Sequence, residues 1–209
     1  MQSLFYAYMK ILLIALLKIL FRFRVFGKEN FRRGAALIAS NHNSFLDPPV
    51  VGAAAPEEIH YIAREDLMRH RIIRWFYSAL NLIPVKRDIA DVRSIRTILQ
   101  KLKEGKKVLI FPEGQRSYDG ELQSAKAGIG FLVCKAEVPI IPAYTYGTYR
   151  AMPRGRNLIY PTKLAVVFGK PIYFDNFFRA KPTRETYKKI SDIVMEKICE
   201  LKKIVEKLV

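Results

Sequence analysis

The chain has few residues with which to hold a metal ion or a disulfide framework. It contains two cysteines and three histidines among 209 residues, and these form neither a Cys-x-x-Cys pair nor a Cys/His cluster. Cys134 and Cys199 both fall within apolar helical patterns, so we expect free, buried thiols. Their scarcity argues against a zinc site and favours a reducing compartment.

Several common signatures of function are also missing. The sequence has no Gly-x4-Gly-Lys-Ser/Thr loop for nucleotide phosphates and no Gly-x-Ser-x-Gly elbow for a serine nucleophile. It has no helix-turn-helix, RNA-recognition or zinc-finger pattern, and its basic residues are spread along the whole chain. We find no internal repeat and no low-complexity linker.

Long hydrophobic runs are absent as well. The longest uncharged apolar run near the N-terminus is Ile11–Leu17, far short of the ~20 residues that span a bilayer core. No small-residue cleavage site follows it, so we do not expect a signal peptide.

What the chain has in excess is positive charge. It carries 36 Lys and Arg against 19 Asp and Glu, a formal net charge of +17, and 50% of its residues are hydrophobic. This composition predicts one folded domain with an anionic partner. Nucleic acid, anionic lipid headgroups and phosphorylated metabolites all fit that description, and charge alone does not choose among them.

The N-terminal segment, Met1–Phe26, is dense in Leu, Ile, Phe and Tyr and broken by single cations. On a helical wheel Lys10, Lys18 and Arg22 fall on one side, while four leucines do not: Leu12, Leu13, Leu16 and Leu20. This pattern favours a helix lying in the membrane interface, with its apolar face in the acyl chains and its cations near lipid phosphates. A helix packed on the protein core and a tilted span with a snorkelling Lys10 are the alternatives.

Apolar runs alternate with helical patterns along the rest of the chain. We expect strands at residues 35–39, 59–63, 82–85, 108–111, 138–144 and 164–168, with helices at 48–55, 68–80, 89–102, 124–136 and 183–209. This alternation predicts an α/β fold, a single domain with a mixed, largely parallel central sheet flanked by helices. The apolar N-terminal segment is expected to be a membrane-associating helical addition to it.

A histidine and an aspartate occupy the loop after the first of these strands. His42 and Asp47 belong to Asn41-His42-Asn43-Ser44-Phe45-Leu46-Asp47-Pro48, and strand ends are the usual place for a site in an α/β protein. A carboxylate that orients an imidazole and stabilises its charged form makes it a general base near neutral pH. The simpler alternative is a helix entry, in which Asp47 accepts backbone N–H groups and His42 is a polar loop residue.

A second polar stretch, Phe111-Pro-Glu-Gly-Gln-Arg-Ser117, also follows an apolar run. Together the two stretches resemble the His-x4-Asp and Phe-Pro-Glu-Gly-x-Arg-Ser boxes of the glycerolipid acyltransferase family, and in particular its bacterial 1-acylglycerol-3-phosphate acyltransferases. The resemblance spans Ala35–Ala143. Arg87 matches the arginine that ends a further box, although Asn81 replaces its usual glycine, and Gln115 replaces a common threonine.

The resemblance implies transfer of a fatty acyl group from a thioester to the sn-2 hydroxyl of 1-acyl-sn-glycerol 3-phosphate, giving phosphatidate. His42 would be the base and Asp47 its orienting partner. The substrate-binding residues would be Arg87, Glu113, Gly114, Arg116 and Lys126, with Glu113 serving either acceptor binding or site scaffolding. Arginine suits the acceptor's phosphate because its fork is bidentate and always charged. Backbone N–H groups near His42 or in the turn at residues 112–114 are candidates for the oxyanion hole.

On this interpretation residues 1–30 anchor the protein to the cytoplasmic face of the cell membrane, as a peripheral or monotopic protein, and residues 31–209 form the acyltransferase domain. The expected partners are the lipid bilayer, lysophosphatidate, and acyl-CoA or acyl carrier protein as donor. We expect no cofactor, no metal and no nucleic acid. Three alternatives remain: another acceptor such as glycerol 3-phosphate or a different lysophospholipid, a non-catalytic module that binds nucleic acid or anionic surfaces, and a phosphate-handling hydrolase.

Overall fold

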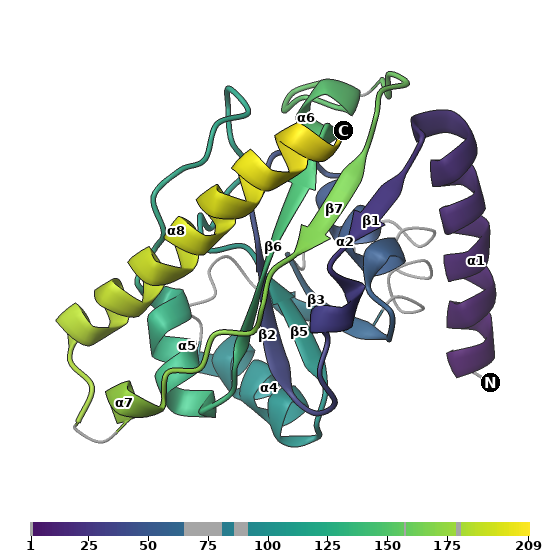
Figure 1. Cartoon of the computed structure of the whole chain (residues 1–209). Coiled ribbons are helices and arrows are strands. Elements are labelled where there is room, and N and C mark those ends of the chain that lie inside the picture. Colours follow the sequence, from purple (N-terminus) through teal and green to yellow (C-terminus); the bar gives the residue numbers. More distant parts are fainter. Residues whose placement is uncertain (1, 65–80, 86–91, 157, 179–180) are drawn as a thin grey trace.

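The fold is built on a seven-stranded sheet. In a computed structural model, which describes residues 2–64, 81–85, 92–156, 158–178 and 181–209, the strand order is β1-β7-β6-β2-β5-β3-β4 (Figure 1). The strands are β1 (Arg24–Phe26), β2 (Ala36–Ser40), β3 (Ile59–Arg64), β4 (Leu82–Val85), β5 (Lys107–Ile110), β6 (Ile140–Tyr146) and β7 (Ala165–Phe168). Neighbouring strands are parallel except β6 and β7. The expected single α/β domain with a mixed, largely parallel sheet is therefore confirmed.

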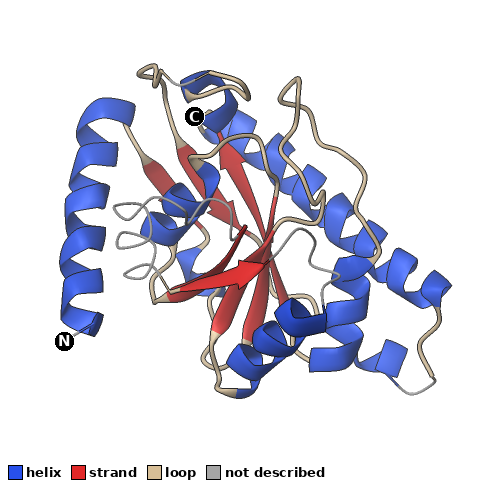
Figure 2. Cartoon of the chain, turned by 180° about the vertical axis from the view of Figure 1, so that it is seen from behind, coloured by secondary structure: helices blue, strands red, loops and turns tan. Residues whose placement is uncertain are grey.

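Helices cover both faces of the sheet (Figure 2). They are α1 (Gln2–Phe21), α2 (Asp47–Ala54), α4 (Val92–Lys103), α5 (Gly128–Ala136), α6 (Thr148–Ala151), α7 (Asp175–Phe178) and α8 (Arg184–Leu208), with a short 3-10 turn, η1 (Lys28–Asn30). The predicted helix at 68–80 lies outside the described residues. Thr183 begins α8 with a capping box, in which Thr183 and Thr186 bond each other's backbone N–H groups.

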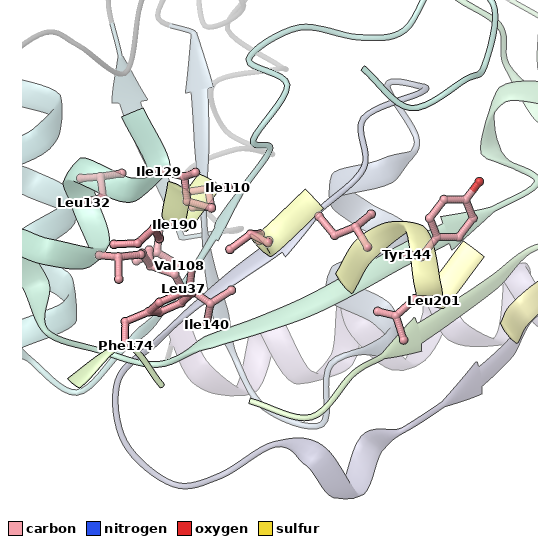
Figure 3. Close-up of a cluster of buried hydrophobic side chains, with 14 of the residues drawn as sticks. Leu37, Val108, Ile110, Ile129, Leu132, Ile140, Tyr144, Phe174, Ile190 and Leu201 are labelled. Atoms are coloured by element: carbon pink, nitrogen blue, oxygen red, sulfur yellow. The ribbon is translucent and has the colours of Figure 1, made fainter. Parts of the chain in front are cut away.

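The hydrophobic core is divided by the sheet because successive strand side chains point to opposite faces. Leu37 and Ala39 of β2 face α4, α5 and α8, together with Ile98, Leu132 and Val194. Figure 3 shows Leu37 and Leu132 in this cluster. Ala36 and Ile38 face the other way, toward α1 and α2. β2 is buried along its whole length, so the loop that follows it starts from a rigid support.

Helix α1 packs on the protein along one face and exposes the other. Leu17, Phe21 and Tyr6 are buried against the domain. Lys10 shares their side of the helix, contrary to the expected grouping with Lys18 and Arg22. Its ammonium donates to the carbonyl of Ala55, and burial lowers the pKa of Lys10. On this face, therefore, α1 is a helix packed on the protein core, which was the alternative to a helix in the membrane interface.

The opposite face of α1 is apolar and exposed. Its side chains include Tyr8, Ile11, Leu12, Leu16, Ile19 and Leu20, of which Ile19 is 78% exposed. Leu13, which was expected on this face, is half-buried against the domain. Within the part of the chain that the structure describes, no helix combines the length and hydropathy needed to cross a bilayer.

The cysteines are only partly as expected. Both are free thiols, but Cys199 is exposed and Cys134 is half-buried. The prediction of buried thiols was therefore wrong for Cys199, because the apolar stripe of α8 faces the sheet through Ile198 and Leu201 and leaves position 199 on the solvent side.

Candidate active site

The two motif stretches meet at the carboxyl edge of the sheet. β2 pairs with β5 on one side and β6 on the other, with Ala39 opposite Ile110 and Ser40 opposite Ala143. Parallel neighbours end at the same edge, so the loops after β2 and β5 lie beside each other. The amide N–H of Ser117 donates to the His42 carbonyl over 2.8 Å, which ties the second stretch to the first.

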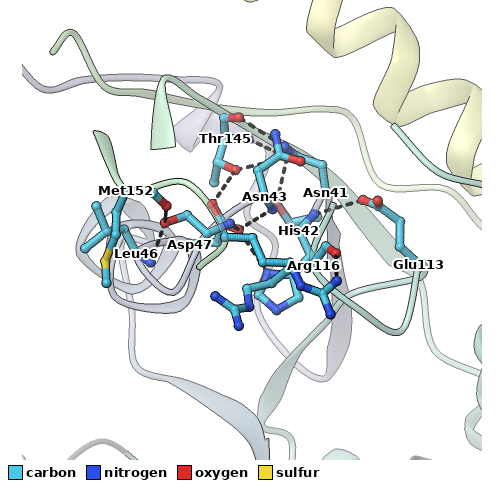
Figure 4. Close-up of polar contacts among 12 residues, drawn as sticks. Asn41, His42, Asn43, Leu46, Asp47, Glu113, Arg116, Thr145 and Met152 are labelled. Atoms are coloured by element: carbon cyan, nitrogen blue, oxygen red, sulfur yellow. Dashed lines mark hydrogen bonds and ion pairs between the residues drawn. The ribbon is translucent and has the colours of Figure 1, made fainter. Parts of the chain in front are cut away.

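His42 and Asp47 are in direct contact. The distance from His42 Nδ1 to Asp47 Oδ2 is 2.9 Å, the aspartate is fully buried, and the histidine side chain is 18% exposed (Figure 4). A carboxylate at Nδ1 favours the tautomer with the proton on that atom, so Nε2 is left as the proton acceptor. The imidazole also stacks on Phe111, with ring centroids 3.9 Å apart and planes 14° apart.

Asp47 is itself held in place from three directions. Its Oδ2 accepts the backbone N–H groups of Asn43 (2.6 Å) and Ser44 (2.7 Å), and its Oδ1 accepts the Thr145 hydroxyl (3.1 Å). α2 begins at Asp47, as the helix-entry alternative requires, but the carboxylate bonds the loop before it and caps no N–H of the helix. The carboxylate of Asp47 therefore both holds the backbone of the loop and contacts His42.

The side chain of Asn41 joins this loop to the backbone of β6. Asn41 donates its Nδ2 to the Thr145 carbonyl (3.1 Å), and its Oδ1 accepts the Thr145 amide (2.7 Å). Both residues are buried. These two bonds take the place of backbone pairing between β2 and β6 beyond the end of β2, so they fix the direction in which the loop leaves the sheet. Sequence reasoning missed Thr145; its signal is a polar residue near the end of an otherwise apolar strand.

Glu113 holds the backbone of the loop that carries His42. Its Oε1 accepts the His42 N–H (2.8 Å) and its Oε2 accepts the Gln123 N–H (3.2 Å). The side chain is 2% exposed, and burial raises the pKa of Glu113 to about 7 against the opposing effect of these two bonds. This geometry favours the scaffolding role over contact with the acceptor. Arg116 forms no ion pair with Glu113 in the described residues.

Gly114 and Lys126 lie against each other. Gly114 adopts φ +71°, and a Cβ built on it would come within 2.9 Å of the Lys126 Cδ and Cε atoms. The backbone N–H of Lys126 donates to the Pro112 carbonyl over 2.9 Å, so Lys126, two residues before α5, is fixed beside the turn. Lys126 is exposed, and the glycine leaves room for its side chain to cross the turn.

Arg116 extends over an aromatic ring at the same edge. Its guanidinium carbon lies 3.5 Å from the centroid of Phe45, which is itself 48% exposed. Burial, and after it the neighbouring Arg154, lower the pKa of Arg116, whereas Asp47 acts in the opposite direction. Sequence reasoning missed Arg154, which belongs to no motif. Arg87 lies outside the described residues.

Metal-binding side chains do not gather in the residues described: no group of three or more His, Cys, Asp or Glu is placed to hold an ion. The chemistry that the site supports is proton transfer at Nε2 of His42. Cations stand nearby at Arg116 and Lys126. These are the parts that a general base and an anionic substrate require.

Comparison with known proteins assigns the class. A family model described as Acyltransferase matches residues 22–146, which contain both motif stretches, and the chain belongs to this family. A 1-acyl-sn-glycerol-3-phosphate acyltransferase of Bacillus subtilis is 28% identical over 187 residues, covering 88% of this chain and 90% of the relative.

Two further comparisons are informative. A chloroplastic enzyme of the same name from Arabidopsis thaliana is 30% identical over 158 residues, 73% of this chain and 44% of the relative. The crystal structure of the 1-acyl-sn-glycerophosphate acyltransferase PlsC from Thermotoga maritima matches with a TM-score of 0.75 and 28% identity, covering 94% of this chain and 81% of that one.

Proposed function

We propose that the protein transfers a fatty acyl group from an acyl thioester to the sn-2 hydroxyl of 1-acyl-sn-glycerol 3-phosphate, making phosphatidate for phospholipid synthesis. The observation that carries this proposal is the His42–Asp47 contact, which leaves Nε2 as a base at the carboxyl edge of the sheet. The names of the relatives from Bacillus and Thermotoga support the choice of acceptor.

The reaction follows from the positions of these groups. His42 Nε2 takes the proton of the acceptor hydroxyl as its oxygen attacks the thioester carbonyl carbon, and Asp47 stabilises the imidazolium. The tetrahedral oxyanion then collapses, the C–S bond breaks, and the imidazolium returns its proton to the leaving thiolate. The thioester is already activated, so no serine or cysteine nucleophile is required. A positioned base of this kind contributes roughly 10²- to 10⁴-fold to the rate.

We further propose that the protein works at the cytoplasmic face of the membrane. Its acceptor is a lipid, and the exposed apolar face of α1 matches the requirement of an interfacial helix, with exposed Lys18 and Arg22 available to lipid phosphates. The donor is carried by coenzyme A or acyl carrier protein. Both carriers are anionic, so the net charge of +17 suits either one.

The test is acyl transfer in mixed micelles or vesicles, with 1-acyl-sn-glycerol 3-phosphate as acceptor. Wild type is compared with His42→Ala, with acyl-CoA and acyl carrier protein offered separately, and His60→Gln on β3 is the histidine control. We expect phosphatidate from wild type and the control, and none above background from a folded His42→Ala. Full activity in His42→Ala would refute the assignment of the base, and wild type that acylates only other lysolipids would refute the acceptor.

Membrane contact has its own test. Leu12→Asp with Ile19→Asp places two carboxylates on the exposed face of α1. Val92→Asp on α4, where Val92 is 69% exposed, is a control that places one carboxylate on another exposed apolar position. We expect the double variant, but not the control, to lose flotation with anionic vesicles. Equal flotation of all three proteins would contradict the proposed role of α1.

A further inference from the structure

Two arginines from distant parts of the chain are held together beside the His42–Asp47 pair. Arg116 follows β5, and Arg154 follows α6. The Arg154 Nη1 donates to the backbone carbonyl of Arg116 over 2.7 Å. The guanidinium carbon of Arg154 lies 3.7 Å from the ring centroid of Tyr118, much as Arg116 lies 3.5 Å from that of Phe45. Each cation therefore lies over an aromatic ring, which attracts it and holds it in place.

Neither guanidinium is neutralised by a carboxylate of the part of the chain that the structure describes. Among the described residues, no carboxylate lies within 4.0 Å of Arg116 or Arg154, whereas surface lysines such as Lys188 and Lys202 do have such partners. Both arginines are half-buried, and their proximity contributes to the lowered pKa of Arg116. Keeping two like charges together costs free energy, and an anion bound between them would remove that cost.

Both arginines are also fixed to the catalytic loop. Ser117, the residue after Arg116, donates its N–H to the His42 carbonyl over 2.8 Å. Met152, two residues before Arg154, accepts the Ser44 hydroxyl with its carbonyl, also over 2.8 Å. An anion bound by the two guanidinium groups would therefore be held at a constant position relative to His42.

We propose that Arg154 binds the acceptor's phosphate together with Arg116, so that the two form a phosphate clamp. This inference rests on the proposed function. A phosphate monoester approaches a charge of −2 at neutral pH and presents three acceptor oxygens, which two guanidinium forks match. A lysophospholipid with a phosphodiester has one charge and fewer free oxygens, so the clamp selects monoesters. Arg154 lies beyond residues 22–146, the part that the family model matches.

The test compares Arg154→Gln and Arg154→Lys with Arg156→Gln, an exposed arginine two residues further on. Two quantities are measured: kcat and KM for 1-acyl-sn-glycerol 3-phosphate in mixed micelles, and the rise in Tm that sn-glycerol 3-phosphate causes without any acyl donor. Loss of charge-assisted hydrogen bonds predicts a KM about 10- to 100-fold higher for Arg154→Gln, with kcat close to that of wild type. Arg154→Lys should recover part of the loss, and Arg156→Gln should behave as wild type.

The outcomes separate binding from support of the loop. If Arg154 only holds the Arg116 carbonyl, Arg154→Gln will lower kcat or Tm and leave KM and the sn-glycerol 3-phosphate effect unchanged, which would overturn the proposal. An equal increase in KM for Arg156→Gln would mean that the loss of any nearby positive charge has this effect, and it would overturn the proposal too. If wild type makes no phosphatidate, the proposed function fails. The clamp would then still be supported by sn-glycerol 3-phosphate raising the Tm of wild type and not of Arg154→Gln.

Discussion

Replacing Glu113 with glutamine tests how the loop that carries His42 is held in place. The carboxylate is 2% exposed and accepts the backbone N–H groups of His42 and Gln123. Glutamine keeps the shape and one acceptor oxygen but cannot ionise. The substitution therefore removes the titration of this group while leaving most of the local packing in place.

The magnitude follows from the pKa. Burial raises the pKa of Glu113 from 4.5 to about 7, so between these values the native state holds a proton that the unfolded chain has released. Stability then falls as pH rises, because the unfolded state binds fewer protons. A shift of this size corresponds to about 3 kcal/mol at pH values above both pKa values. Between about pH 4 and pH 8, the unfolding free energy of wild type should fall by roughly that amount relative to that of Glu113→Gln.

The assay is urea unfolding of both proteins across this pH range in one detergent, followed by circular dichroism. Glu29→Gln, which changes an exposed carboxyl group on η1, is the control and should follow wild type. A difference in unfolding free energy between wild type and Glu113→Gln that stays constant with pH would refute the reasoning. Glu113→Ala provides an activity test. It leaves the His42 N–H without its partner at a cost of about 1–3 kcal/mol, so its kcat should fall further than that of Glu113→Gln.

Three other predictions concern the same edge of the sheet. Asp47→Asn keeps the volume but removes the negative charge that stabilises the imidazolium of His42, so kcat should fall by roughly 10²- to 10⁴-fold with KM little changed; steady-state kinetics would show this fall, and a near-normal kcat would contradict the prediction. Thr145→Val removes the hydroxyl bonded to Asp47 Oδ1 and should lower the unfolding free energy by about 1–3 kcal/mol in urea titrations; an unchanged midpoint would contradict it. Gly114→Ala places a Cβ at φ +71° against Lys126, so it should cost about 1–2 kcal/mol of stability and raise KM for the acceptor; wild-type values of both Tm and KM would count against this account.

Much of the fold could be predicted from short-range patterns. The strands at residues 35–39 and 108–111 were recognised from apolar runs that are buried on both faces, and the stripe of α8 from residues such as Ile190 and Val194 at helical spacing. These patterns express the local periodicity of backbone and side chains, which does not depend on where the element is placed.

The orientation of α1 could be predicted only in part. An apolar helix with scattered cations indicates that one side meets an apolar environment and another a polar one. A helical wheel alone does not show which side packs against the rest of the protein. The structure buries Tyr6 and Leu17 and turns Lys10 toward the Ala55 carbonyl, leaving Leu12 and Ile19 exposed. The choice depends on the surface of α2, which is distant in sequence.

The sequence by itself determined which side chains are proposed for the chemistry: His42 and Asp47 lie five residues apart, close enough for one loop to join them, and their types limit what they can do. Only the tertiary structure decided what surrounds them. Thr145 reaches the site from β6 and Arg154 from the loop after α6, and Glu113 turns its carboxylate to the His42 backbone. The physical reason is that parallel strands bring loops from distant parts of the chain to one edge. The contacts formed there depend on strand order and register, which local sequence does not encode.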